Sequence, residues 1–455
     1  MTLSSLHRTS PAPPVRIVHL GLGAFSRSHT AWYTHASPNG EEWGIAAYTG
    51  RSRDLSDRLS AQEGLFTLIQ RDDKGDRAEV VASVARAHPG DDIDALVQDL
   101  AAAETSIVTL TITEVGYCLG FDDQPDDADP MVAHDREELR SVATGRLTLS
   151  KARPVTAPGR LLLGLEARRR AGGGPIAVLS CDNIPDNGGR LRRGLIAWVE
   201  GPAPDLCQWI NANVSFVSSS VDRITPRISA PEEGILRARY GDQAPVVTEP
   251  FRDWVISGSF PAGRPAWEGA GARFVEDIEP WEARKLWLLN GAHTLLACLG
   301  LLRGHETVAD AIADPVCRSA VDALWDDAEV ALPSGIDVGA YREALLERFA
   351  NPRIAHLLGQ IVQDTDTKIQ LRVTPVAEIL RARADEARGC GLALAAWITA
   401  RANGLIPGSH AAQMSPDHVK TLVHQASAVL SADEAFLAQV NRFVESFAGV
   451  TNGRR

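Results

Sequence analysis

Several features of membrane, secreted and nucleic-acid-binding proteins are missing from this chain. It contains no run of about 18 apolar residues, which excludes a lipid-exposed spanning helix as a sequence-based expectation. Residues 1–14, MTLSSLHRTSPAPP, lack the charged-then-apolar order of a secretory signal and are predicted to be a disordered leader. There is no lysine-rich tract or basic arm, and a formal net charge of −12 argues against nucleic acid as a partner.

Paired cysteines are also missing. The six cysteines stand singly, without the C-x-x-C or Cys/His spacing of a zinc site and without the pattern of a disulfide framework. They are Cys118, Cys181, Cys207, Cys298, Cys317 and Cys390. The sequence therefore predicts free thiols, no metal and a cytoplasmic location, with a small molecule rather than a membrane or a nucleic acid as the partner.

Strand-like and helix-like segments alternate in the first 278 residues. The predicted strands are VRIVHLGLGAF (15–25, running into a glycine turn), WGIAAYTG (43–50), SIVTLTIT (106–113), PIAVLSCDN (175–183) and VSFVSSSVD (214–222). Helical segments between them are RSHTAWYTHA (27–36), DDIDALVQDLAAA (91–103) and GRLRRGLIAWVE (189–200). This alternation is typical of an α/β domain with a largely parallel sheet that is covered on both faces.

The pattern changes after about residue 278. The remaining segments are long and helical in period, and Pro/Gly breaks such as LPSG and LIPGS separate them. We therefore predict a first domain over residues 15–278 and a second, mostly α-helical domain over residues 279–455, which binds the substrate and carries the catalytic residues.

A glycine-rich turn follows the first predicted strand. Gly21 and Gly23, in GLGAFS, permit a tight turn and a close approach of backbone N–H groups to a pyrophosphate, although Ser26 stands where the third glycine of the dinucleotide fingerprint is usual. This turn predicts a Rossmann-type domain that binds NAD or NADP, with Gly21, Gly23, Ala24, Phe25, Ser26 and Arg27 as cofactor-binding residues. Arg51 could meet a 2′-phosphate and Asp54 a ribose diol, or both could lie in an ordinary solvated loop.

The segment KLWLLNGAH, residues 285–293, carries polar groups on an apolar helix. At 100° per residue, Glu282, Lys285, Asn290 and His293 fall within an arc of about 140°. They could be satisfied core groups, or a helix interface with an ion pair between Glu282 and Lys285. Four convergent groups on the helix that opens the second domain favour an active site in the cleft between the two domains.

The sequence has no zinc-ligand cluster, so a metal is not expected to polarise an alcohol at such a site. A nicotinamide-dependent dehydrogenase without a metal needs a protein base, and a lysine desolvated by leucine and tryptophan can have a lowered pKa. Lys285 is that candidate. Asn290 and Asn183 can donate to a developing alkoxide, His293 can orient a hydroxyl, and Glu282 can pass the proton to solvent.

These residues resemble the polyol-specific long-chain dehydrogenases, the mannitol dehydrogenase family, which includes mannitol 2-dehydrogenase, arabinitol dehydrogenase and fructuronate reductase (mannonate oxidoreductase). The resemblance extends over nearly the whole chain. It rests on VHLGLGAFSRSHTAWY, AQEGLFTLIQRD, TITEVGY, LSCDNIPDNG, VDRITP, EPFRDWVI, KLWLLNGAH and DTDTKIQLR.

The resemblance implies roles for individual residues. The matching lysine is the general base, the two asparagines bind the reacting oxygen and the glutamate relays protons. It also implies that Asp222 and Lys368 contact the substrate or shape its pocket, and Glu114 in TEVGY joins the predicted cofactor-binding residues. The chain departs from the usual family motifs at Ser26, at Val115 and in the sequence DTDTK. Such departures could change cofactor binding and substrate choice.

The substrate is less sharply indicated. Gln360 stands where mannitol 2-dehydrogenases have an arginine, and QIVQDTDTKIQLR is closest in style to fructuronate reductases, although arabinitol dehydrogenases share the glutamine. A linear sugar acid of the D-mannonate/D-fructuronate type is therefore predicted, with Arg372 or Arg223 as a partner for its carboxylate. The alternatives are a mannitol- or arabinitol-type dehydrogenase acting on uncharged polyols and a non-catalytic nucleotide-binding regulator.

Overall fold

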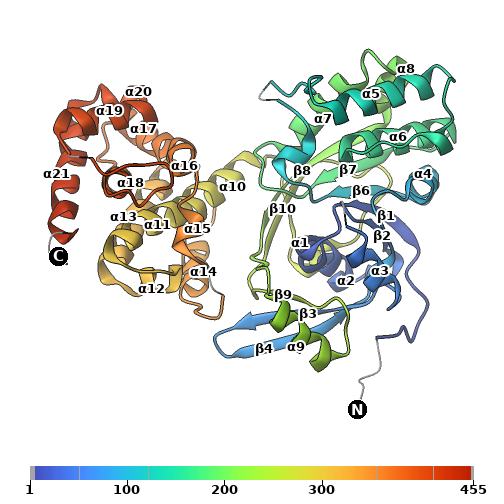
Figure 1. Cartoon of the computed structure of the whole chain (residues 1–455), viewed down its shortest axis with the longest axis horizontal. Helices are drawn as coiled ribbons and strands as arrows, with labels where there is room; N and C mark the ends of the chain where they lie inside the picture. Colours follow the sequence, from blue (N-terminus) through green and yellow to red (C-terminus); the bar gives the residue numbers. More distant parts are fainter. Residues whose placement is uncertain (1–5, 51, 121, 355, 413, 452–455) are drawn as a thin grey trace. The chain divides into compact units, whose positions relative to one another are not determined.

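The chain divides into two compact units (Figure 1). The computed structural model describes residues 6–50, 52–120, 122–354, 356–412 and 414–451. Unit 1 comprises Met1–Arg71 and Gly75–Ile278, and unit 2 comprises Asp72–Lys74 and Glu279–Arg455. The main division falls where the sequence changes from alternating strands and helices to helices alone.

An eight-stranded sheet forms the centre of unit 1. Its strands, in spatial order, are β11 (Arg273–Phe274), β10 (Asp253–Ser257), β8 (Val214–Asp222), β7 (Ile176–Ser180), β6 (Ile107–Leu110), β1 (Val15–Leu20), β2 (Gly44–Tyr48) and β5 (Val84–His88). From β5 to β8 all neighbours are parallel, and β10 joins β8 antiparallel. The order β5-β2-β1-β6-β7-β8 is that of a dinucleotide-binding sheet, whose switch point lies between β1 and β6.

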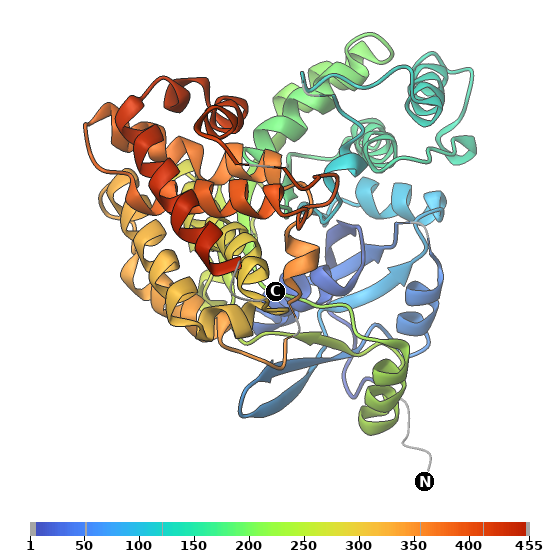
Figure 2. The ribbon, with the colours of Figure 1, turned by 60° about the vertical axis from the view of Figure 1, so that its left-hand side comes forward.

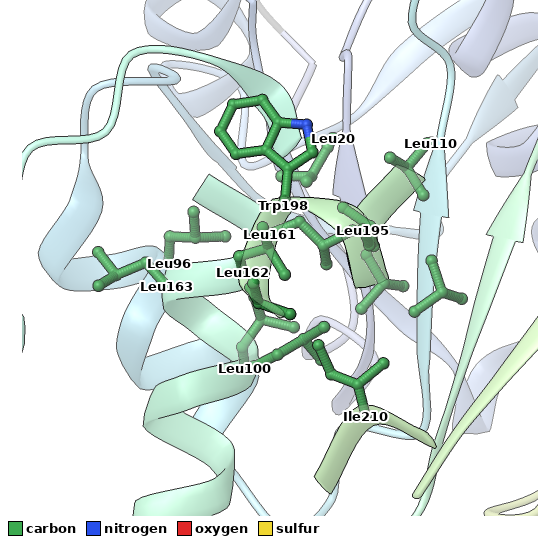
Figure 3. Close-up of a cluster of buried hydrophobic side chains, with 14 of the residues drawn as sticks. Leu20, Leu96, Leu100, Leu110, Leu161, Leu162, Leu163, Leu195, Trp198 and Ile210 are labelled. Atoms are coloured by element: carbon green, nitrogen blue, oxygen red, sulfur yellow. The ribbon is translucent and has the colours of Figure 1, made fainter. Parts of the chain in front are cut away.

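Helices cover both faces of this sheet because successive residues of its strands point to opposite sides. Val18 and Leu20 of β1 join one buried cluster, and Ile17 joins the other. Figure 3 shows part of the first cluster, in which leucines of α4 and α6 meet residues of α7 and α8. The helices of unit 1 are α1 (Ala24–Ser26), α2 (Trp32–Ala36), α3 (Asp54–Ser60), α4 (Ile93–Ala101), α5 (Pro130–Ala143), α6 (Ala157–Arg170), α7 (Asn187–Val199), α8 (Pro204–Asn213) and α9 (Ala230–Tyr240).

Three features of unit 1 were not predicted from the sequence. A second, three-stranded sheet contains β4 (Gly75–Val81), β3 (Phe66–Asp72) and β9 (Val246–Thr248). Short 3₁₀ turns occupy Gly40–Glu42, Glu114–Tyr117, Leu149–Lys151 and Trp267–Ala270. The predicted helix over residues 27–36 contains a π-helical segment, Arg27–Ala31, between α1 and α2.

The predicted disordered leader is wrong for residues 6–14. The Arg8 guanidinium donates to the carbonyls of Glu63, Ala82 and Val84 at 2.7–2.8 Å, and the Gly44 N–H donates to Pro14. These bonds tie the segment to the edge of the sheet. Residues 1–5 lie outside the described residues.

Unit 2 is helical, and Figure 2 shows its helices from a second side, coloured yellow to red. The buried helix α11 packs against α13, α15 and α18, and α18 packs against α21. The helices are α10 (Glu279–Arg284), α11 (Gly291–Arg303), α12 (Val308–Ala313), α13 (Pro315–Ala331), α14 (Gly339–Phe349), α15 (Leu358–Ile361), α16 (Thr365–Arg372), α17 (Thr374–Ala382), α18 (Arg388–Ala402), α19 (Pro416–Ala426), α20 (Ala428–Ser431) and α21 (Glu434–Thr451).

One helical stretch, Glu279–Arg303, has the length and composition of a membrane span. Most of its apolar window is buried inside unit 2, as in the core helix of a globular domain. All six cysteines are free, as predicted.

Candidate active site

The glycine turn joins the carboxyl ends of three strands. Gly21 has φ +103°, and a Cβ at this position would lie 2.3 Å from the carbonyl oxygen of Thr111, directly after β6. The N–H groups of Gly21 and Leu22 both donate to Tyr48, the last residue of β2, at 3.0 and 2.8 Å. Backbone conformation and close packing therefore both require glycine at residue 21.

Gly23 is a glycine for a different reason. Its φ of −154° is extended backbone that any residue adopts, and a Cβ here would meet nothing closer than 3.7 Å. Neither strain nor crowding within the chain explains the missing side chain. A methyl group would fill space at the start of a helical stretch, where a pyrophosphate approaches the backbone in dinucleotide-binding folds.

The side chain of Ser26 forms a hydrogen bond within this turn. Its hydroxyl accepts the Gly23 N–H at 2.9 Å, and the side chain is buried. The third glycine of the usual fingerprint is thus replaced by a residue that caps the turn. Ala24 and Phe25 are half-buried, and the Phe25 ring stacks on His29 with centroids 4.9 Å apart.

The side chain of Arg27 is bonded to the backbone of the turn. It is buried, and its guanidinium donates to the carbonyls of Gly23 and Ala244. Burial lowers the pKa of Arg27 to about 10, and the charge of Asp242 partly opposes this shift. That Arg27 binds the cofactor stays a prediction. Arg51 lies outside the described residues, and the exposed carboxylate of Asp54 pairs with Arg58 at 2.6 Å.

An exposed apolar side chain follows β6. Glu114 and Val115 belong to the 3₁₀ turn Glu114–Tyr117, and Val115 is 86% exposed in this chain. The Glu114 carboxylate is also exposed and lies 3.6 Å from Arg190. Both side chains thus stand at the carboxyl edge of the sheet, beside the switch point.

Asn183 follows β7 in an exposed loop whose two neighbours are held firmly. The buried Tyr117 hydroxyl donates to Asp182, and the other Asp182 oxygen accepts the Ile184 N–H at 3.0 Å and the Asn187 amide at 3.2 Å. Asn187 in turn bonds both backbone groups of Ser219 on β8, at 2.8 and 3.0 Å. Sequence reasoning missed Tyr117, Asp182 and Asn187, although they lie within the quoted motifs TEVGY and SCDNIPDN.

Asp222 is the last residue of β8, Arg223 follows it, and both are buried. Asp222 faces Asp253 across the antiparallel pair β8–β10. The Arg223 guanidinium donates to the carbonyls of Ser28 at 2.5 Å and Glu249 at 3.3 Å, and burial lowers its pKa to about 10. Its Nη2 atom is buried without a hydrogen-bond partner among the described residues, so the possibility that Arg223 binds a substrate carboxylate stays a prediction.

The helix that carries the predicted base is interrupted by a π turn. Lys285–Asn290 is π-helical between α10 and α11, and the Gly291 N–H donates to Leu286, five residues earlier. An i→i+5 turn holds more residues than an α-helical turn, so residues five apart, such as Lys285 and Asn290, lie closer to the same side of the helix than in an α-helix. Uniform α-helical geometry predicted an arc of about 140° for the four polar residues, and the π turn narrows it.

Lys285 lies where the helix passes from half-buried to buried residues of unit 2. Lys285, Leu286 and Trp287 are half-buried, whereas Leu288 and Leu289 are buried. Glu282 lies one turn before Lys285 and is also half-buried. The polar groups thus begin at the accessible part of the helix and continue into its buried part.

His293 lies within that buried part, between two rings. Its ring centroid is 4.9 Å from that of Phe349 and 4.7 Å from that of His356, with the two imidazoles at 78°. Burial, followed by His356, Arg348, Arg372 and Lys368, lowers the pKa of His293 well below its usual value. A neutral imidazole can exchange hydrogen bonds with a hydroxyl at neutral pH. His356 had no signal in the sequence reasoning.

Two cations of α16 lie near this histidine. Lys368 donates to the carbonyls of Ile361 at 2.8 Å and Gln363 at 2.5 Å, and burial and Arg372 lower its pKa. Arg372 donates to the Asn290 carbonyl at 3.3 Å and the Thr294 hydroxyl at 3.1 Å, and burial lowers its pKa to about 10. No carboxylate in the described part of the chain forms an ion pair with either.

Gln360, the remaining predicted substrate residue, lies on the short helix α15 and is exposed within unit 2. One group elsewhere in unit 2 has metal-binding residue types. Ligand atoms of His305, Asp314 and Cys317 lie within 4.8 Å of one another. Arg303 donates to the same Asp314 oxygen as His305, at 2.5 Å against 2.9 Å, which makes this group an ion-pair cluster.

Comparison with known proteins identifies the family. A family model described as the mannitol dehydrogenase Rossmann domain matches residues 15–269, and the mannitol dehydrogenase C-terminal domain matches residues 277–448. The chain belongs to the mannitol dehydrogenase family. The family, the fold class and the enzyme class predicted from the sequence are thereby confirmed.

Relatives of known name act on different substrates. D-mannonate oxidoreductase of Escherichia coli (strain K12) is 34% identical over 396 residues, which cover 84% of this chain and 79% of that protein. D-arabinitol 4-dehydrogenase of Ralstonia nicotianae is 38% identical over 405 residues, covering 85% of this chain and 82% of that protein. The substrate therefore does not follow from family membership.

A solved structure of the same family was bound to its cofactor. The Pseudomonas fluorescens mannitol 2-dehydrogenase ternary complex with NAD and D-mannitol matches with a TM-score of 0.75 and 32% identity, over 97% of this chain and 93% of that chain. A D-sorbitol dehydrogenase in substrate-free form matches with a TM-score of 0.80 and 27% identity, over 95% of this chain and 94% of that chain.

Proposed function

We propose that this mannitol dehydrogenase family member is an NAD-dependent, metal-independent oxidoreductase. It interconverts a secondary alcohol and a ketone on a linear sugar acid of the D-mannonate/D-fructuronate type. Lys285 is the general base, and Asn290 and Asn183 donate to the reacting oxygen. The observation that carries the proposal is the π turn over Lys285–Asn290, which turns the two residues toward the same side of the helix.

The residues of unit 1 fit NAD. When bound, this cofactor supplies the hydride acceptor. The free space at Gly23 accommodates a pyrophosphate close to the backbone, and the Ser26 hydroxyl keeps the turn in shape. Val115 offers an apolar surface at the carboxyl edge of the sheet.

The residues of unit 2 fit an acid–base reaction on an alcohol. Lys285 takes the hydroxyl proton as the ketone forms and returns it in the reverse direction, and Glu282, one helical turn earlier, passes the proton to solvent. The Asn290 amide stabilises the oxygen as negative charge develops on it. His293 stays neutral and holds a neighbouring hydroxyl.

The charge on α16 supports an acidic substrate. Arg372 and Lys368 are partly buried cations four residues apart, and their hydrogen bonds go to neutral oxygens. Like charges at this spacing repel each other, and an anion relieves that repulsion. A carboxylate offers Arg372 two oxygens in the geometry of its guanidinium.

A second candidate substrate is an uncharged polyol. The identity of 38% to a D-arabinitol 4-dehydrogenase favours it. In that case Lys368 and Arg372 hold hydroxyl groups and contribute less to specificity.

The test is an absorbance assay at the nicotinamide band, with NAD and NADP, over D-mannonate, D-fructuronate, D-mannitol, D-arabinitol and D-fructose. We expect the highest kcat/KM on the sugar acids with NAD. Turnover restricted to the uncharged substrates would replace the sugar acid by a polyol.

A Lys285→Met variant tests the base and the enzyme class together. We expect kcat to fall about 10²–10⁴-fold, the usual contribution of general acid–base catalysis, while NAD binds as in the unmodified protein. Wild-type turnover in this variant would remove Lys285 from the mechanism. A wild-type chain that binds NAD and is inert on the whole panel would favour a non-catalytic nucleotide-binding regulator.

A further inference from the structure

The register between Lys285 and Asn290 depends on a single turn of unusual geometry. In an α-helix, residues five apart point about 140° away from each other, and only an i→i+5 turn brings them together. The Gly291 N–H donates to the carbonyls of Leu286 and Leu288, and the first of these bonds closes an i→i+5 turn. π turns are rare and occur frequently at functional sites, so the side chains that bond the carbonyls of this one are of interest.

Two buried side chains donate to carbonyls of the turn. The indole Nε1 of Trp325, on α13, donates to the Leu288 carbonyl at 2.8 Å, and Trp325 is fully buried. The Thr294 hydroxyl donates to the Asn290 carbonyl at 3.0 Å, and Thr294 is also buried. The indole N–H can only donate, and Leu288 gives it an acceptor in an otherwise apolar core.

We propose that Trp325 is a positioning residue that holds the π turn Lys285–Asn290 and thereby keeps the Asn290 amide in register with the Lys285 amine. The inference rests on the proposed function for the roles of these two residues. Trp325 itself touches no reacting group in this scheme. Its effect on turnover passes through the backbone of residues 286–291.

The first arm of the test measures the turn directly in a Trp325→Phe variant, which keeps an aromatic ring and removes the donor. Hydrogen–deuterium exchange of peptides covering residues 285–295 is expected to be faster in this variant, because the backbone bonds of the turn open more often. The matched control is Trp267→Phe in unit 1, which removes a buried indole bond of 3.1 Å to Thr34 and leaves the exchange of residues 285–295 unchanged.

The second arm measures whether Trp325 acts through Asn290. We expect kcat to fall about 10–100-fold in Trp325→Phe with a smaller change in KM, because a displaced donor acts on the transition state. Combined with Asn290→Ala, Trp325→Phe adds little further loss, since both variants remove the same interaction. The Trp267→Phe control keeps the wild-type kcat.

The outcomes separate the inference from the proposed function. Unchanged exchange at 285–295 in Trp325→Phe, or a loss in kcat fully additive with Asn290→Ala, would overturn the inference alone. Wild-type turnover in Lys285→Met would overturn the proposed function whatever Trp325 does. If Trp325→Phe does not fold, Trp325→Met, which also removes the donor and has a flexible side chain that fills irregular space, carries both arms: faster exchange together with lower kcat supports the inference, and a wild-type value of either overturns it.

Discussion

The two units set their functional groups in place by different means. In unit 1 the glycine turn, the Glu114–Tyr117 turn and the Asn183 loop each follow a parallel strand, β1, β6 or β7. The sheet thus fixes their positions through the backbone, because the carboxyl ends of parallel strands share one edge. In unit 2 the groups come from helices distant in sequence, and side chains position them: His356 packs on His293, and Arg372 bonds Asn290.

This difference affects how each half tolerates substitution. A strand end is held by ladder hydrogen bonds that no single side chain controls, so the sensitive positions in unit 1 are those where the backbone itself is crowded. A helical site depends on individual donors and rings. We therefore expect substitutions in unit 1 to lower mainly the free energy of unfolding, and substitutions in unit 2 to change mainly substrate specificity and turnover.

The largest effect is expected at Gly21, with Gly23 as its matched control. A Gly21→Ala methyl would lie 2.3 Å from a backbone oxygen at a φ of +103°, so the free energy of unfolding should fall by about 3 kcal/mol or more. Gly23→Ala has extended backbone and open space, so we expect its stability to change by less than about 0.5 kcal/mol.

Binding distinguishes the two glycines further. NAD should bind Gly23→Ala at least about tenfold more weakly, because the methyl group occupies the approach of the pyrophosphate. Urea unfolding and calorimetric titration with NAD measure the two quantities. Unchanged NAD affinity in Gly23→Ala would mean that the pyrophosphate lies elsewhere.

Two arginines, Arg372 of unit 2 and Arg223 of unit 1, test whether substitution in unit 2 changes specificity while substitution in unit 1 changes stability. Arg372→Gln keeps an amide donor and removes the charge, so we expect kcat/KM on a sugar acid to fall about 10–100-fold and that on a polyol to change about threefold or less. Arg223→Gln should leave the ratio of the two substrates unchanged and destabilise the protein by about 2–3 kcal/mol, because Arg223 is buried. An equal loss on both substrates in Arg372→Gln would remove its role in binding a carboxylate.

The same difference explains which features could be predicted from the sequence. Strand alternation and the glycine turn are local patterns, so the parallel sheet, the position of Gly21 and the loop of Asn183 follow from short segments. The lysine, asparagine and histidine of KLWLLNGAH are also local. The helical second domain follows from long segments of helical period, and the resemblance to the mannitol dehydrogenase family supplied the roles of its polar residues.

Features that depend on packing between distant segments could not be predicted. Nothing in the spacing of Lys285 and Asn290 indicates a π turn, since the helix period was taken as uniform and the donor from Trp325 comes from another helix. Arginine is a common ligand of anions, and only the structure shows that Arg27 and Arg223 donate to backbone carbonyls. His356 meets His293 across 63 residues of chain, beyond the reach of any sequence period.

The smallest expected effect concerns two buried histidines, one in each unit. His19 on β1 has hydroxyl partners at both ring nitrogens, Thr109 at 2.8 Å and Thr111 at 3.1 Å, whereas the Nε2 atom of His293 is buried with no partner among the described residues. Burial lowers the pKa of His19 to about 4, so its neutral form is favoured in the folded state. Its contribution to stability is complete above the unfolded pKa of about 6.5 and is lost as the pH falls towards 4.

Between pH 7 and 5.5 this linkage should cost about 1 kcal/mol of the free energy of unfolding. A His19→Gln variant does not bind that proton on unfolding, so the pH dependence of its stability should be smaller than that of the wild-type chain by this amount. Urea unfolding at the two pH values measures the difference. An identical pH dependence in both proteins would mean that the pKa of His19 is the same in the folded and unfolded states. Burial in the sheet of unit 1 would then not disfavour the charged form of the imidazole.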